Sequence, residues 1–315
     1  MSRRHHILLA LSAVALGTAA CREAAVPDAP SAGGETLKVY TVNYPLQYFA
    51  ERIGRDLVEV AFPAPGEVDP AEWRPDDETI RRYQQADLIL LNGAGYARWT
   101  RHVSLPAGRQ IDTAAGFADQ LLEVPDAVVH SHGDGDPHAH AGTAFTTWID
   151  PLLALEHARA IQEAFRDRLP EHAAIFEQSF EALADDLRAL HEELETAVAQ
   201  DPERPLFASH PVYHYLEARY GLKLESFHWE PDEMPNESAW EAFERKRGEF
   251  PASRMLWEGQ PLDETAELLA ERGVESIVFN PCSQPPASGD FLDVMRENAS
   301  NLHRAFAPED NTATP

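Results

Sequence analysis

Short apolar runs alternate with amphipathic stretches in two separate parts of the chain. The first part contains three predicted strands, at 37–42, 57–62 and 87–91, and two predicted helices, at 46–57 and 76–86. The second part contains four predicted strands, at 205–208, 222–227, 254–257 and 275–279, and two predicted helices, at 211–220 and 262–272. Strands that alternate with helices are typical of parallel sheets. The pattern therefore predicts an α/β protein with two parallel-sheet lobes.

One long amphipathic stretch separates these two parts. Apolar residues recur every three or four positions from Phe176 to Val198, which predicts one buried helix face. Pro170 suits the first turn of this helix or of a short helix before it. We expect this single long backbone helix to join the lobes and to limit the hinge between them.

The first 21 residues have the order of an export signal. A basic start is followed by an apolar run, 7–16, that is too short to span a bilayer, and then by small residues before Cys21. This order predicts a bacterial lipoprotein signal in which Cys21 carries the lipid, with ordinary cleavage nearby as the alternative. No disulfide is expected once Cys21 is lipidated, because Cys282 is the other cysteine.

These features define an expected domain organisation. It consists of the signal, a flexible tether, an N-terminal α/β lobe, a linking helix, a C-terminal α/β lobe and a loose tail, at 1–21, 22–36, 37–169, 170–200, 201–307 and 308–315. We expect an exported monomer that is held on a bacterial membrane by its lipid and lies in the periplasm or on the cell surface.

The charge balance narrows the choice of partners. The chain has 26 Lys and Arg against 53 Asp and Glu, for a formal charge of −27, and its 43% hydrophobic residues suffice for packed cores. Nucleic acid and anionic lipid both require a basic surface, so neither is an expected partner by charge. An acidic protein is compatible with handling cations.

Histidines gather in one glycine-rich loop at 130–140. The loop contains four imidazoles together with two aspartates: His130, His132, His138 and His140, with Asp134 and Asp136. Such a loop suits loose capture of zinc rather than a closed tetrahedral site. We interpret it as an auxiliary metal loop; a hydrophilic loop without a metal role is the alternative.

Other candidate ligands follow predicted strands. Ligands of open α/β sheets bind outside the carboxyl ends of strands. Four residues occupy such positions in the second part of the chain: His210, His228, Glu258 and Asn280. His214 would share a helix face with His210 if a helix begins near Pro211. The pair lacks the glutamate of an HExxH zinc-protease motif.

The order of these segments resembles the TroA-like solute-binding proteins of zinc and manganese ABC importers. The segments are VYTVNYPLQYFAERIGRD, the P-G-x-x-D-P turn at 65–70, ADLILLNGAGYARW, the histidine loop, TWIDP at 147–151, SHPVYHYLEARYGL, MLWEGQ and VFNP. The resemblance implies two α/β lobes joined by a backbone helix, with one metal ion between them. It also implies delivery of that ion to an ABC permease and its ATPase, with no chemistry on the ligand.

The family's ligand pattern is altered in this chain. Its four ligand positions, three histidines and an acid, correspond here to Ala71, Thr146, His210 and Asn280. Alanine has no donor atom, and neutral oxygens bind zinc less well than imidazole or carboxylate. Substitute ligands beside His210 would be Glu72, His214, His228 or Glu258.

Several functions remain open beside capture of zinc or manganese. The cleft could bind a metal complex or another small solute, or the histidine loop could act as a metal buffer or chaperone. An adhesion lipoprotein is a further alternative, because solute-binding folds are reused. A secreted zinc hydrolase built on His210, His214 and a carboxylate is the enzymatic alternative. We expect no enzyme, because no motif supplies three ligands and a general base.

Overall fold

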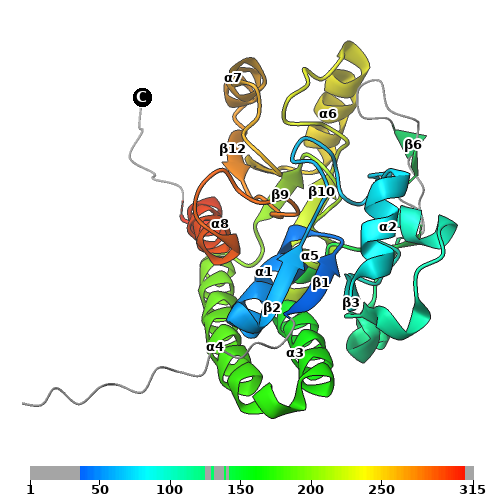
Figure 1. Cartoon of the computed structure of the whole chain (residues 1–315). Coiled ribbons are helices and arrows are strands. Elements are labelled where there is room, and N and C mark those ends of the chain that lie inside the picture. The colour runs from blue at the N-terminus through cyan, green and yellow to red at the C-terminus, as the bar shows by residue number, and fades with distance from the viewer. Residues whose placement is uncertain (1–35, 125–128, 131–137, 140–141, 309–315) are drawn as a thin grey trace, which may run out of the picture. The chain divides into compact units, whose positions relative to one another are not determined.

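The computed structural model describes residues 36–124, 129–130, 138–139 and 142–308 (Figure 1). The predicted signal with Cys21, the tether up to residue 35, His132, His140 and the tail beyond residue 308 lie outside these ranges. The described residues form one compact unit. The lobe boundaries given above therefore stay a prediction.

The N-terminal sheet is parallel, with strand order β2-β1-β3-β4. Its strands are β1 (Leu37–Thr41), β2 (Val58–Ala61), β3 (Leu88–Leu91) and β4 (Gln110–Asp112). The sequence LILL of β3 is apolar throughout because this central strand is covered on both faces. The three strands predicted here are confirmed, whereas β4 was not predicted, because three residues carry no periodicity.

The C-terminal sheet repeats this arrangement, with strand order β10-β9-β11-β12 and parallel pairing throughout. Its strands are β9 (Pro205–Ala208), β10 (Lys223–Ser226), β11 (Arg254–Trp257) and β12 (Glu275–Val278). All four were predicted to within one residue at either end. The predicted α/β class with two parallel sheets is confirmed.

Helices cover both sheets and connect them. They are α1 (Tyr44–Gly54), α2 (Asp77–Gln85), α3 (Pro151–Arg168), α4 (Ala173–Val198), α5 (His214–Tyr220), α6 (Glu237–Glu249), α7 (Asp263–Glu271) and α8 (Phe291–Phe306). Two short antiparallel pairs join β5 (Glu123–Val124) to β8 (Gly142–Thr143) and β6 (Val129–His130) to β7 (His138–Ala139). Among the described residues, no helix is both long and apolar enough to cross a membrane.

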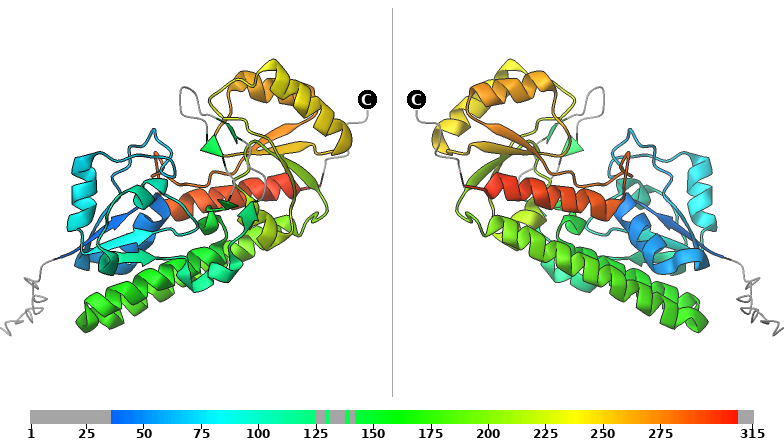
Figure 2. Two further views of the ribbon diagram at one scale, coloured as in Figure 1. Left: turned by 90° about the vertical axis from the view of Figure 1, so that its right-hand side faces the viewer. Right: turned by 90° about the vertical axis from the view of Figure 1, so that its left-hand side faces the viewer.

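Helix α4 is the predicted backbone helix, preceded by a short 3-10 turn at Pro170–His172. All seven apolar residues of its predicted face are buried: Phe176, Phe180, Leu183, Leu187, Leu190, Leu194 and Val198. Helix α8 lies along α4 and adds a second connection between the sheets (Figure 2). At its start the Phe291 ring meets Phe49 of α1 at 5.2 Å, and at its end Arg204 and Arg254 both donate to the Ala305 carbonyl.

A segment after β12 fastens the two halves of the chain together. Among the described residues, four hydrogen bonds cross to the N-terminal half: Trp148 Nε1 to the Pro281 carbonyl at 2.7 Å, the Tyr44 amide to the Ser283 carbonyl at 3.1 Å, and Gln284 Nε2 to the Pro65 carbonyl at 2.8 Å and to the Val68 carbonyl at 2.6 Å. Direct bonds therefore restrain hinge motion in addition to the backbone helix.

Asp150 makes a further cross-link and also caps α3. Its Oδ1 accepts from the Leu152 amide at 2.9 Å, and its Oδ2 accepts from Arg219 of α5 at 2.8 Å. The carboxyl is almost fully buried. Burial raises the pKa of this carboxyl despite Arg219. Replacing it with a neutral side chain of the same shape should therefore destabilise the protein less than removing the cap.

We expect D150A to lower the free energy of unfolding by about 2–4 kcal/mol, because it removes the cap and leaves Arg219 without its buried partner. D150N keeps an amide oxygen for the cap and should lose at most about half as much. Urea unfolding at pH 7 measures both values. Equal losses in the two variants would show that the cap contributes nothing.

Candidate metal site

A cavity of about 130 Å³ lies between the carboxyl ends of the two sheets. We call it the cleft. It is lined from the C-terminal half by His210, Val212, Glu230, Glu258, Pro281 and Ser283, and from the N-terminal half by Asp69, Tyr96, Phe145, Thr146 and Trp148. His210 follows β9 by two residues and Glu258 follows β11 directly, which is where ligands bind in open α/β sheets.

His210 is oriented by a carboxylate. Its Nδ1 lies 2.8 Å from Glu258 Oε1, and its side chain is only 5% exposed. An ionised carboxylate only accepts hydrogen bonds, so Nδ1 carries the ring proton and Nε2 is the nitrogen with the lone pair. Metal-binding histidines are characteristically held in this way, with the second ring nitrogen donating to a carboxylate.

Glu230 faces that second nitrogen. Its Oε1 lies 4.0 Å from His210 Nε2. Zinc–nitrogen and zinc–oxygen bonds are each about 2.0–2.2 Å long, so one ion can bridge the two atoms, and a tetrahedral angle at the ion requires the two side chains to approach each other slightly. Over the ranges that the structure describes, no group of three or more His, Cys, Asp and Glu side chains is spaced to hold a metal ion. The geometry thus offers two protein donors to one ion.

The three substituted family positions serve the backbone. Ala71 is buried, and its amide donates to Asp69 Oδ1 at 2.9 Å. The Thr146 hydroxyl donates to the Val212 carbonyl across the cleft. Asn280 is exposed, and its Oδ1 accepts from the Cys282 amide at 2.7 Å. Asn280, predicted from its strand-end position, therefore lies outside the cleft lining.

The structure does not bring the other predicted ligands into the cleft lining. His228 stands next to His210, with ring centroids 5.6 Å apart and planes at 81°. His214 begins α5, where burial lowers its pKa. Glu72 pairs with Arg98 at 3.3 Å. In the auxiliary loop, His130 of β6 is opposite His138 of β7 in the strand register.

Three ionisable residues of the cleft lining were not predicted from the sequence: Asp69, Tyr96 and Glu230. Asp69 belongs to the P-G-x-x-D-P turn and Tyr96 to the segment after β3, so the signal was present in motifs that were already recognised. Glu230 stands four residues after β10, two positions beyond the candidate His228. Nothing in its spacing marks it, because its place is set by the loop that follows the strand.

A buried histidine supports the wall that carries Thr146. His157 of α3 is fully buried between two threonines, with Nδ1 2.7 Å from Thr113 Oγ1 and Nε2 2.7 Å from Thr147 Oγ1. The Thr113 hydroxyl donates its proton to the Leu91 carbonyl, so it accepts from Nδ1–H. Nε2 therefore accepts from Thr147, and burial lowers the pKa of His157 to about 3.

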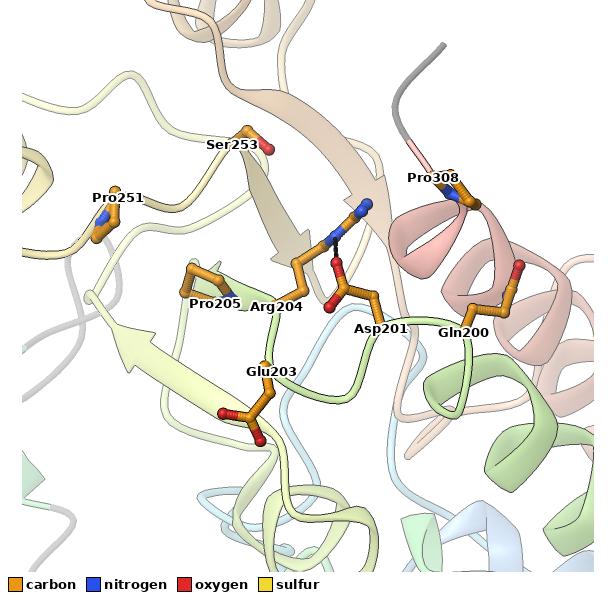
Figure 3. Close-up of a pocket in the computed structure, with 8 residues that line it drawn as sticks. All are labelled: Gln200, Asp201, Glu203, Arg204, Pro205, Pro251, Ser253 and Pro308. Atoms are coloured by element: carbon orange, nitrogen blue, oxygen red, sulfur yellow. Dashed lines mark hydrogen bonds and ion pairs between the residues drawn. The ribbon is translucent and has the colours of Figure 1, made fainter. Parts of the chain in front are cut away.

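Other hollows lie elsewhere on the described part of the molecule, and two of them are several times larger than the cleft. One, of about 540 Å³, is at the amino ends of β9 and β11 and is lined by Arg204, Asp201 and Ser253, among others (Figure 3). Arg204 is held there by Asp201 at 3.0 Å and by the last carbonyls of α8. The other, of about 630 Å³, is a groove along α4 and α8. Both lie away from the carboxyl ends of the strands, so volume alone does not identify the site.

The chain is similar to metal-binding proteins over most of its length. It is 24% identical to the high-affinity zinc uptake system protein ZnuA of Bacillus subtilis over 313 residues, which cover 94% of this chain and 95% of the relative. It is 26% identical to the manganese-binding lipoprotein MntA of Halalkalibacterium halodurans over 212 residues, covering 66% and 65%.

A solved structure supports the fold. The crystal structure of the metal-dependent lipoprotein YcdH from Bacillus subtilis superposes with a TM-score of 0.74 at 21% identity, covering 86% of this chain and 99% of that one. The sequence model of the ZnuA family, described as "Zinc-uptake complex component A periplasmic", matches residues 39–305. The predicted resemblance to solute-binding proteins of metal importers is confirmed, and the chain belongs to the ZnuA family.

Proposed function

We propose that this protein captures one divalent metal ion, zinc or manganese, in the cleft and delivers it to an ABC permease and its ATPase. The observation that carries the proposal is the His210–Glu258 pair, which fixes the tautomer of a buried imidazole. That tautomer aims Nε2 at Glu230 across a gap that one ion spans.

The charge of the cleft supports a cation as the ligand. Three acidic residues line it, Asp69, Glu230 and Glu258, around one imidazole. Carboxylates gathered in a partly enclosed space repel one another and lose part of their hydration, and a bound cation compensates both costs. Membership of a solute-binding family agrees with capture and release rather than catalysis.

The size of the cleft favours an ion over a metal complex. A water molecule takes about 30 Å³ in the liquid, so 130 Å³ holds an ion with a few waters. Drug-sized ligands occupy pockets of about 300–1,000 Å³. An imidazole favours zinc, and carboxylate oxygens suit manganese as well, so this donor set suits either ion.

The remaining parts of the proposal concern place and partners. The predicted lipid on Cys21 would anchor an exported monomer to a bacterial membrane, near the permease. The histidines of the 130–140 loop would act as an auxiliary contact that raises the local concentration of metal. The histidines that lie outside the cleft, His214 and His228, and the two polar residues Glu72 and Asn280 would support the site without binding the ion in this arrangement.

The test is calorimetric titration of the metal-stripped protein with zinc, with manganese and with calcium as a control. We expect one cleft ion per chain for zinc or manganese. At 100 times the dissociation constant, binding adds about 2.7 kcal/mol of stability and raises Tm on the order of 5–10 °C. Neither heat nor a thermal shift with zinc or manganese would exclude the proposal.

A further inference from the structure

Tyr96 lines the cleft, and its buried hydroxyl has no hydrogen-bond partner among the described residues. The residue is 7% exposed. A buried hydroxyl without a partner costs about 1–3 kcal/mol in protein stability. Other buried tyrosines of this chain have a hydrogen-bond partner. The Tyr83 hydroxyl donates to the Thr41 carbonyl at 2.8 Å, and the Tyr213 hydroxyl donates to the Phe279 carbonyl at 2.9 Å.

The side chain of Tyr96 is held in place on both faces and along its backbone. Its ring meets Trp148 at 5.5 Å and Phe145 at 5.3 Å, both nearly perpendicular, and its amide donates to the Gly93 carbonyl at 3.0 Å. The loop before it turns through positive φ at three successive residues, Gly93, Ala94 and Gly95. A β-carbon at Gly93 would lie 2.3 Å from Asp112 Oδ1, so the loop requires glycine there. The hydroxyl therefore cannot swing away to find a partner.

The hydroxyl keeps its proton near neutral pH. Burial, and then the charges of Asp69 and Glu72, raise the pKa of Tyr96. A neutral phenol is a weak metal ligand but a good hydrogen-bond donor. In a cavity that holds an ion and a few waters, a suitable acceptor is the oxygen of a water on the ion.

We propose that Tyr96 donates a hydrogen bond to a water molecule that the captured ion keeps, so that the cleft takes the ion partly hydrated. This inference rests on the proposed capture of a divalent cation. It names a recognition residue that contacts the ion through water. It also explains why an unsatisfied hydroxyl persists in the folded protein: its cost is relieved only when the ligand is bound.

The test is Y96F, which removes only the hydroxyl. Because the metal-free protein loses an unsatisfied buried group, its Tm should rise by about 2–4 °C. Because the complex loses a hydrogen bond, affinity for zinc or manganese should fall about tenfold. The matched control Y83F loses a satisfied hydroxyl in the N-terminal core, so its Tm should fall while its metal affinity stays unchanged.

A second measurement concerns the water itself. Water-proton relaxation of the bound Mn²⁺ should show at least one exchangeable inner-sphere water in the wild-type complex. If wild-type protein binds neither ion, the proposed function fails. If wild-type protein binds and Y96F binds equally well, or if bound Mn²⁺ carries no water, only the role of Tyr96 is overturned.

Discussion

Replacing His210 with alanine is expected to weaken binding of zinc or manganese by more than about 100-fold, the upper range for loss of an outer-shell partner. The variant removes the one imidazole among the described residues that line the cleft and leaves Glu230 and Glu258 to repel each other. Competition with a chromophoric chelator measures the affinity directly.

Two further variants make this result specific. E258Q keeps the size of the side chain but weakens the acceptor that orients the imidazole, so it should cost about 10–100-fold in affinity. H303A removes an exposed histidine of α8 and should change nothing. If H210A binds as tightly as the wild type, the metal is held elsewhere, and the histidine loop at 130–140 becomes the metal-binding element.

His157 is expected to make the protein increasingly sensitive to acid. Its pKa is about 3 in the folded state, against an ordinary value of 6.5. Below pH 6.5 this imidazole therefore binds a proton in the unfolded chain but not in the folded chain. For each pH unit below 6.5, this difference lowers the free energy of unfolding by about 1.4 kcal/mol. The stability that depends on a neutral His157 is fully present above pH 6.5 and is lost progressively as the pH falls toward 3.

The measurement compares urea unfolding at pH 6.5 and pH 4.5. H157Q cannot titrate, so it should be less stable than the wild type at pH 6.5 but lose about 2–3 kcal/mol less on acidification. T147V keeps the imidazole and removes the donor to Nε2, so it should lose about 1–3 kcal/mol at pH 6.5 and retain the wild-type slope. Parallel slopes for wild type and H157Q would contradict the assignment.

The fold was predictable where one face of an element is buried. The α4 pattern succeeded because seven apolar residues at helical spacing all point into the core. Helix α6 was missed because it fully buries one residue, Phe243, and most of its other residues are polar. Helix α3 was missed because alanines obscure its periodicity, although Asp150-Pro151 carries the signal of a capped first turn.

The site was predictable only as far as local sequence fixes it. His210 and Glu258 were found because strand ends converge at one edge of a parallel sheet. Asn280 has the same kind of position, yet its amide turns back to the Cys282 backbone, which no strand rule foretells. Thr146 likewise lines the cleft, but its hydroxyl donates to the Val212 carbonyl. Such choices depend on which carbonyl or amide lies within reach after folding.

Helix α8 has a consequence for how this chain is made. It is the last helix described, its residues Phe291, Leu302 and Phe306 are completely buried, and it packs mainly against α4, which ends about a hundred residues earlier. Until those residues leave the ribosome, the facing surface of α4 stays exposed and the core cannot close. In a growing chain, this surface of α4 is therefore buried only after α8 has emerged.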